Sequence, residues 1–189
     1  MIALTYRSRA ALAALFLLVL ALVGGVPSTA RDATAVERAA LDKTIADFDA
    51  MMREKRYAET IDTVPAKLID LISKQANITS EQLRAIMREQ VAATFKSVEI
   101  ESFSFDKQKT EVKALPNGTP YGLIPTTTVV KTQGLRMRSV DQTVALLDGG
   151  KWYLVRVSAP QQSQLLKVAY PEFQNVEIAA PVVERLPVN

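Results

Sequence analysis

The chain has 189 residues, of which 48% are hydrophobic, and carries a formal net charge of +3. It contains neither histidine nor cysteine, which excludes histidine-based catalytic triads, zinc sites with histidine or cysteine ligands, haem bound by imidazole, and disulfides. No stripe of lysine and arginine indicates nucleic-acid binding. We expect no metal and no cofactor. Because histidine and cysteine are frequent catalytic residues, their absence also makes an enzyme a less favoured interpretation.

The first thirty residues are typical of a secretory signal peptide. Two arginines precede an unbroken apolar run over Ala10–Val23, and the small residues Ser28 and Ala30 have the spacing of a cleavage site. The alternative is an uncleaved anchor, but the run is short against the roughly 20 residues that span a bilayer. The sequence therefore predicts an exported protein, periplasmic or secreted, with a signal peptide over 1–30, no stable membrane span after cleavage, and one domain over 31–189.

Three helices are predicted before the first strand. Apolar residues recur at spacings of three to five over 35–56, as on one face of an amphipathic helix. A second helix is expected from Pro65, because proline suits the first turn of a helix. Thr79 and Gln82 have the spacing of a capping box, which predicts that a third helix begins there and runs over about 81–95.

The strand period replaces the helical one after Lys96. The apolar residues change face within the first strand, 98–105, which indicates a bulge or a bend. A short helix over 163–169 follows the last strand, and residues 159–189 as a whole are expected to form a docked, partly irregular tail. This order predicts an α+β fold in which three N-terminal helices pack on a curved, four- to five-stranded antiparallel sheet. The further strands are expected over 110–115, 121–131, 135–147 and 151–157.

The stretch Asp148-Gly149-Gly150 predicts a tight hairpin between the last two of these strands, because a two-residue primed turn requires positive φ at its central positions. The central pair is either Asp148-Gly149 or Gly149-Gly150. With the first of these, Asp141 lies directly opposite Arg156. In both cases odd-numbered residues of the first strand share a face with even-numbered residues of the second.

One face of this hairpin is a candidate pocket. It carries Trp152 near the turn, with Asp141, Thr143 and Arg156 farther along. The functional interpretation is a pocket between sheet and helices that is floored by Trp152 and tipped with Asp141 and Arg156. The alternative is a cross-strand ion pair and a core tryptophan, and this more ordinary interpretation is favoured.

The other face carries Val144, Tyr153 and Val155 and is apolar over much of its length. A solvated face needs fewer apolar residues. We therefore expect a second layer or a partner subunit to cover it, and a homodimer through these residues is one interpretation.

The element order and the late hairpin LLDGGKWYLVRV (146–157) resemble the nuclear transport factor two-like superfamily, also called cystatin-like, which includes ketosteroid isomerases, dehydratases, polyketide cyclases and many exported bacterial proteins. The resemblance covers about 35–158 and implies a cone whose mouth often holds a ligand and whose outer sheet face often makes a dimer. Active members use carboxylate, tyrosine or histidine groups, but this chain has no histidine, and no such Asp/Tyr pair is identified in it.

Two functions of different class follow. The preferred hypothesis is an exported, non-enzymatic binding or accessory domain whose cone-shaped pocket takes a small apolar ligand or an envelope protein. The alternative is a metal-free lyase or isomerase acting on a small apolar molecule in the same pocket, with Asp141 as acid or base and Arg156 tuning it. A purely structural role in an envelope complex is a third hypothesis.

Overall fold

The structure is a computed structural model that describes residues 31–187. The predicted signal peptide lies outside these residues. No helix within 31–187 is both long and apolar enough to cross a membrane. In chain order the elements are α2 (Ala35–Arg53), η1 (Tyr57–Thr63), α3 (Ala66–Ala76), α4 (Ser80–Thr94), β1 (Glu99–Phe105), η2 (Lys107–Lys109), β2 (Glu111–Ala114), β3 (Pro120–Thr132), β4 (Leu135–Asp148), β5 (Lys151–Val157), α5 (Pro160–Ala169), η3 (Pro171–Phe173) and β6 (Val182–Leu186).

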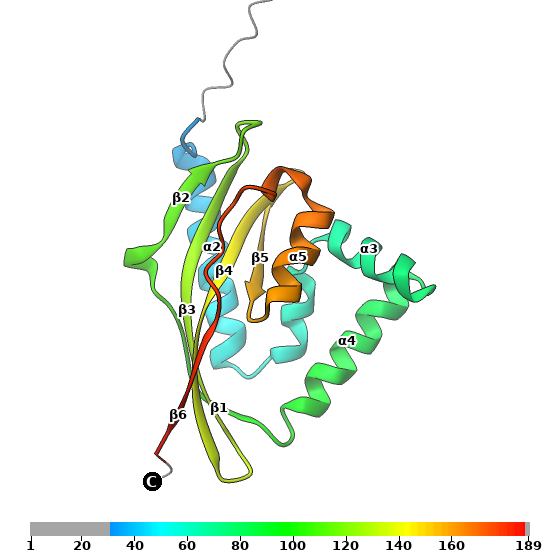
Figure 1. Ribbon diagram of the computed structural model, residues 1–189, viewed down its shortest axis with the longest axis vertical. Coiled ribbons are helices and arrows are strands. Elements are labelled where there is room, and N and C mark those ends of the chain that lie inside the picture. Colours follow the sequence, from blue (N-terminus) through cyan, green and yellow to red (C-terminus); the bar gives the residue numbers. More distant parts are fainter. Residues whose placement is uncertain (1–30, 188–189) are drawn as a thin grey trace, which may run out of the picture.

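The centre of the molecule is the long antiparallel hairpin of β3 and β4 (Figure 1). On one side β1 and β2 pair with successive parts of β3, and on the other side β5 and β6 pair with successive parts of β4. The predicted α+β class, with helices ahead of a curled antiparallel sheet, is therefore confirmed. The described sheet has six strands, so the predicted count of four to five is too low.

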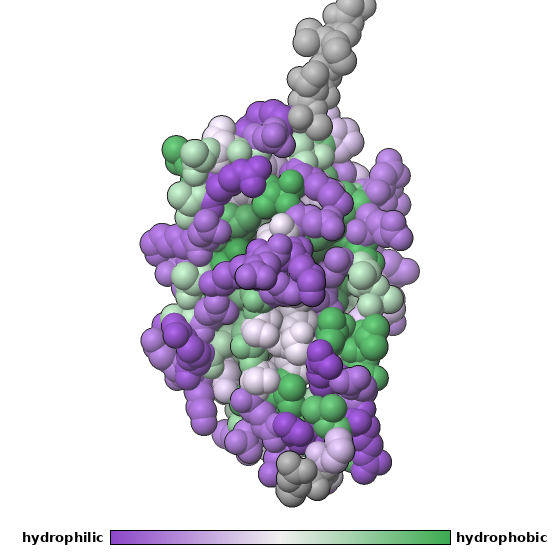
Figure 2. Space-filling view, turned by 90° about the vertical axis from the view of Figure 1, so that its left-hand side faces the viewer, coloured by the Kyte–Doolittle hydropathy of each residue, from purple (hydrophilic) through white to green (hydrophobic). Residues whose placement is uncertain are grey.

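The additional strand is β6, which lies in the predicted irregular tail. Its residues Val182 and Val183 are β-branched and suit a strand, while Pro181 and Pro187 bracket it, as is usual at the ends of edge strands. Both valines remain more than half exposed, at 63% and 62%. Hydrophobic side chains are scattered among hydrophilic ones on the side of the molecule seen in Figure 2.

The helix boundaries follow local backbone chemistry. The capping box predicted at the third helix is confirmed: Gln82 N donates to Thr79 Oγ1 at 3.2 Å, and Thr79 N donates to Gln82 Oε1 at 2.9 Å. The first helix ends at Arg53 and not at the predicted residue 56. The reason is Lys55, whose φ of 58° is left-handed and cannot continue a right-handed helix.

Apolar cores lie on both faces of the sheet. On one face α2 packs its Leu41 and Ile45 against Trp152 and Leu154 of β5. On the other face the C-terminal elements α5 and η3 cover Val144 and its neighbours. The chain's own C-terminal segment therefore supplies a second helical layer on this face.

That second layer answers the question of what covers the apolar sheet face. Val144 is fully buried beneath Leu166 and Phe173, while Tyr153 and Val155 pack at the edge of the same core and stay partly exposed. A homodimer through Val144, Tyr153 and Val155 stays a prediction, although much of this face is already occupied.

The late hairpin turns at Gly149-Gly150. Asp148 pairs with Lys151, and the two glycines have φ of 58° and 78°, as a primed turn requires. Arg156 consequently lies opposite Thr143. The placement of Asp141 directly opposite Arg156, which belonged to the Asp148-Gly149 turn, is wrong by two residues along β4.

Candidate functional site

An apolar cavity of about 370 Å³ lies between the helices and the sheet, and we call it the apolar cavity. Its walls come from the end of α2, η1, α3, α4, β1, β5 and α5, so elements distant in sequence meet around it. Among the residues that the structure describes, Arg156 is the only charged one in this lining. The lining residues are Phe48, Met52, Tyr57, Thr60, Ile61, Thr63, Val64, Leu68, Ile72, Val91, Phe95, Ile100, Phe103, Leu154, Val155, Arg156, Gln162 and Leu165.

Aromatic side chains form two parts of the wall of the apolar cavity. The rings of Tyr57 and Phe95 lie 4.2 Å apart between centroids, and those of Phe48 and Phe103 lie 5.7 Å apart. Burial, and then the nearby Glu99 carboxylate, raises the pKa of Tyr57 above its ordinary value. The Tyr57 hydroxyl is therefore neutral at physiological pH and adds no charge to the cavity.

Helix α4 forms the outer wall and is fastened to η1 mainly by polar contacts. Arg84 donates from Nη1 to the Ile61 carbonyl at 3.0 Å and from Nη2 to the Val64 carbonyl at 3.3 Å, and Arg88 pairs with Asp62. Only Leu83 of this helix is buried. Val91 and the adjoining Phe95 are half-buried and line the cavity, while Ile86 is 42% exposed.

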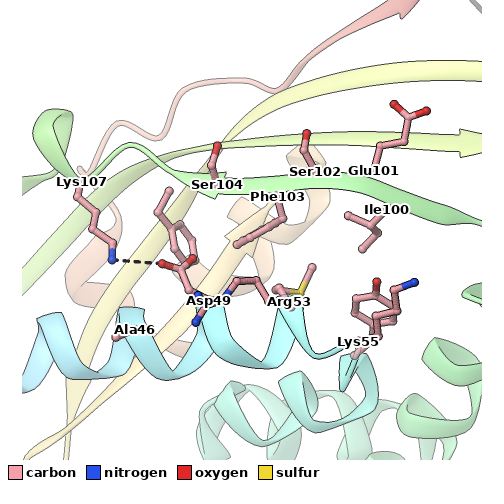
Figure 3. Close-up of a pocket in the computed structure, with 13 residues that line it drawn as sticks. Ala46, Asp49, Arg53, Lys55, Ile100, Glu101, Ser102, Phe103, Ser104 and Lys107 are labelled. Carbon is pink, nitrogen blue, oxygen red and sulfur yellow. Dashed lines mark ion pairs between the residues drawn. The ribbon is translucent and has the colours of Figure 1, made fainter. Parts of the chain in front are cut away.

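A second, larger space of about 640 Å³ lies between α2 and β1, and we call it the α2–β1 slit. Figure 3 shows Phe103 and Ile100 directed from β1 toward the helix, while Ser102 and Ser104 point away from it. An ion pair between Lys107 Nζ and Asp49 Oδ2, 3.2 Å long, crosses the slit (Figure 3).

The slit and the apolar cavity are neighbours, because Met52, Tyr57, Ile100 and Phe103 line both. Five charged side chains also line the slit: Asp49, Arg53, Lys55, Glu101 and Lys107. Sites for small apolar molecules are mostly hydrophobic with a few placed polar groups. The apolar cavity has this character and the slit does not.

Arg156 and Asp141 meet as an ion pair at one wall of the apolar cavity. The guanidinium donates from Nε to both carboxylate oxygens at 3.0 Å and from Nη2 to Oδ2 at 2.6 Å. Ser139 Oγ donates to Oδ2 at 3.0 Å. The Asp141 side chain is completely buried, while the Arg156 side chain remains 32% exposed. Arg156 lines the cavity, and Asp141 lies behind it.

The other two predicted site residues belong to the core. Trp152 is 3% exposed, and its Nε1 donates to the Glu37 carbonyl of α2 at 2.8 Å. Thr143 is buried, and its hydroxyl bonds with that of Thr126 at 2.8 Å. Neither residue lines the apolar cavity. Of the predicted set, only Arg156 reaches it.

Sequence reasoning missed most of the cavity wall, including Tyr57, Val91, Phe95 and Phe103. The usable signal was the apolar stripe of the third predicted helix, which contains Val91 and continues into Phe95. A stripe of this kind indicates that something apolar lies opposite, but not whether that is a packed core or a cavity.

In the part of the chain that the structure describes, the lining of the apolar cavity offers no group for acid or base catalysis by a carboxylate. Both oxygens of Asp141 accept hydrogen bonds from Arg156, and no carboxylate lines the apolar cavity among the described residues. A general base must reach the proton that it abstracts. The arrangement therefore offers the lyase or isomerase hypothesis no carboxylate that faces a bound molecule. Within 31–187, no three or more acidic residues gather in a group that could hold a metal ion.

Comparison with protein-family models, curated proteins and solved structures finds no match to this chain.

Proposed function

We propose that this protein is an exported, non-enzymatic binding protein that holds a small apolar molecule in the apolar cavity. The observation that carries the proposal is the cavity itself: about 370 Å³, walled by seven elements, with one charged residue in its lining. Ligand pockets typically measure roughly 300–1,000 Å³ and combine apolar walls with a few polar groups.

Packing supports this proposal. Protein interiors are close-packed, with few voids larger than a water molecule. The sheet follows this rule at its two cores, where Val144, Ala145 and Ile124 are completely buried. A large apolar space beside such well-packed layers is a specific feature of α4, which packs on η1 and α3 instead of on the sheet. An apolar guest restores the missing contacts.

The test is a fluorescence titration with Nile red, an uncharged dye whose emission rises in apolar surroundings. Wild type is expected to bind it with saturation. Val91→Trp should abolish or strongly weaken binding, since Val91 lies in the α4 wall and a larger side chain fills the cavity. Val168→Trp on α5 is the matched control, because Val168 is 61% exposed and does not line the cavity.

Equal binding by wild type and Val91→Trp would place the dye elsewhere and contradict the proposal. Absence of saturable binding to wild type would contradict it too. Circular dichroism of both variants confirms that the fold is kept.

A further inference from the structure

We infer that the bound molecule is uncharged and carries a hydrogen-bond acceptor, such as an ester, ketone or alcohol oxygen, which Arg156 holds. This inference rests on the proposed function and adds the chemical class of the ligand. It follows from the hydrogen bonds of Arg156: some N–H donors of its guanidinium bind Asp141, and the others have no partner among the described residues.

The edge of the guanidinium formed by Nε and Nη2 donates its hydrogen bonds to Asp141. Nη1 has no acceptor among the described residues, and Arg156 lines the apolar cavity. A guanidinium has five N–H donors in a fixed plane. Donors therefore remain for a molecule in the cavity, and the bonds to Asp141 hold the guanidinium plane in place.

Asp141 also determines the net charge of the polar group that faces a ligand in the cavity. Its carboxylate is completely buried directly behind Arg156, so the pair is neutral as a unit. Within residues 31–187, no lysine and no other arginine lines the apolar cavity. An anionic ligand would lose its water without gaining a free positive charge, and would lie near a like charge in an apolar site. A neutral acceptor has a far smaller desolvation cost and makes the same hydrogen bond.

The volume of the cavity guides the choice of probe molecules. At roughly 30 Å³ per heavy atom, taken from the volume of a water molecule in the liquid, 370 Å³ accommodates about a dozen heavy atoms. Methyl decanoate and decanoate are a suitable pair of probes, since they share one chain and differ in the charge of the head group.

The experiment measures the displacement of Nile red by each probe at pH 8. Wild type should bind methyl decanoate more tightly than decanoate. Arg156→Lys keeps the positive charge beside Asp141 but removes the second donor edge, and should weaken methyl decanoate about 3- to 10-fold, the worth of one hydrogen bond. Arg138→Met is the control: Arg138 pairs with Glu184 on exposed strands, does not line the cavity, and should leave both affinities unchanged.

The variant Asp141→Asn gives the most specific test of the inference. It keeps the shape of the side chain but removes the buried negative charge, so Arg156 becomes a free cation facing the cavity. The order of the two probes should then reverse, with decanoate bound more tightly than the ester. Because one partner of a buried pair is removed, the fold of this variant is checked by circular dichroism. If the variant unfolds, the Arg156→Lys result and the wild-type order decide alone.

Tighter binding of decanoate than of the ester by wild type would overturn the inference. Equal ester affinity in wild type and Arg156→Lys would also overturn it. These outcomes leave the proposed function intact, since both require binding in the cavity. Loss of the proposed function would appear differently, as no saturable Nile red signal in wild type.

Discussion

Asp141 and Arg156 lie on neighbouring antiparallel strands but not directly opposite each other. Arg156 pairs in register with Thr143, so its side chain reaches diagonally across β4 to place Nη2 2.6 Å from Asp141 Oδ2. Diagonal neighbours of this kind are within reach of long side chains. The diagonal reach brings the guanidinium to the cavity wall while the carboxylate stays buried beneath it.

Removal of one partner should therefore cost more than removal of both. Arg156→Met leaves the buried carboxylate with Ser139 alone, and we expect a loss of about 2–4 kcal/mol in the free energy of unfolding, below the full value for a buried pair because Arg156 is partly exposed. The double variant Asp141→Asn/Arg156→Met should recover much of that loss. Urea unfolding followed by circular dichroism measures both. A double variant less stable than Arg156→Met alone would contradict this account.

Trp152 should act as a structural residue. Trp152→Phe removes the hydrogen bond to the Glu37 carbonyl and part of a buried ring, so we expect a loss of about 1–3 kcal/mol. Tyr153→Phe, one position along and half-buried, should change stability by about 0.5 kcal/mol or less. Neither change should alter Nile red affinity, because Trp152 does not line the apolar cavity. A large change in Nile red affinity in Trp152→Phe would show that Trp152 contributes to binding and would contradict its assignment as a structural residue.

Thr128 and Thr126 offer a matched pair on one strand. Thr128 is buried, and its hydroxyl has no hydrogen-bond partner among the described residues. The Thr126 hydroxyl donates to the Ile124 carbonyl or bonds with Thr143. Thr128→Val should therefore be neutral or stabilising by up to about 1 kcal/mol, while Thr126→Val should cost about 1–3 kcal/mol. Thermal unfolding of the two variants measures this difference, and a Thr128→Val variant less stable than Thr126→Val would disprove the prediction.

Glu37 should make stability depend on acid pH. The side-chain hydrogen bond from Arg31, followed by that from the Thr34 backbone, lowers the pKa of Glu37 to about 2. A folded-state pKa below the unfolded value of roughly 4.3 gives stability that is present above that pH and is lost as the pH falls through the folded pKa. The melting temperature of wild type should exceed that of Glu37→Gln near neutral pH.

That difference should shrink between about pH 4.5 and about pH 2. Glutamine keeps the capping box and the backbone acceptor of Trp152 in place, so the comparison isolates the charge. A difference that stays constant down to pH 2 would mean that the carboxylate does not contribute in this way.

The fold class could be predicted from the sequence because the local signals agree with one another. The capping box at Thr79 and Gln82, the strand bulge and the two-glycine turn are each set by neighbouring residues, and the structure contains all three. The bulge lies between Ile100 and Ser102, where the apolar residues of the first strand change face.

Long-range arrangement was harder to predict. The pairing of β6 with β4 joins residues that are 42 to 50 positions apart, from Val140 with Val182 to Arg136 with Leu186, and no local pattern indicates which strand the tail pairs with. The covering of the second sheet face by α5 and η3 is equally non-local. The sequence shows that this sheet face is apolar, but it does not show whether a partner subunit or the chain's own tail covers it.

The candidate site was predicted only in part for the same reason. Alternation along the hairpin put Asp141, Trp152 and Arg156 on one face correctly. Their different depths depend on α2, which covers Trp152, and on η1, which leaves Arg156 beside a cavity. The cavity wall on α4 comes from packing that no local pattern specifies.

The most direct test of the central claim is a methyl chemical-shift titration of the isotopically labelled protein with methyl decanoate. Saturating shifts should concentrate on the methyl groups of Ile61, Ile72, Val91 and Leu165, which line the apolar cavity on four different elements. The methyl groups of Val144, which is completely buried and does not line the apolar cavity, should not move. Shifts confined to the exposed Val182 and Val183, or no saturable shifts at all, would contradict the account.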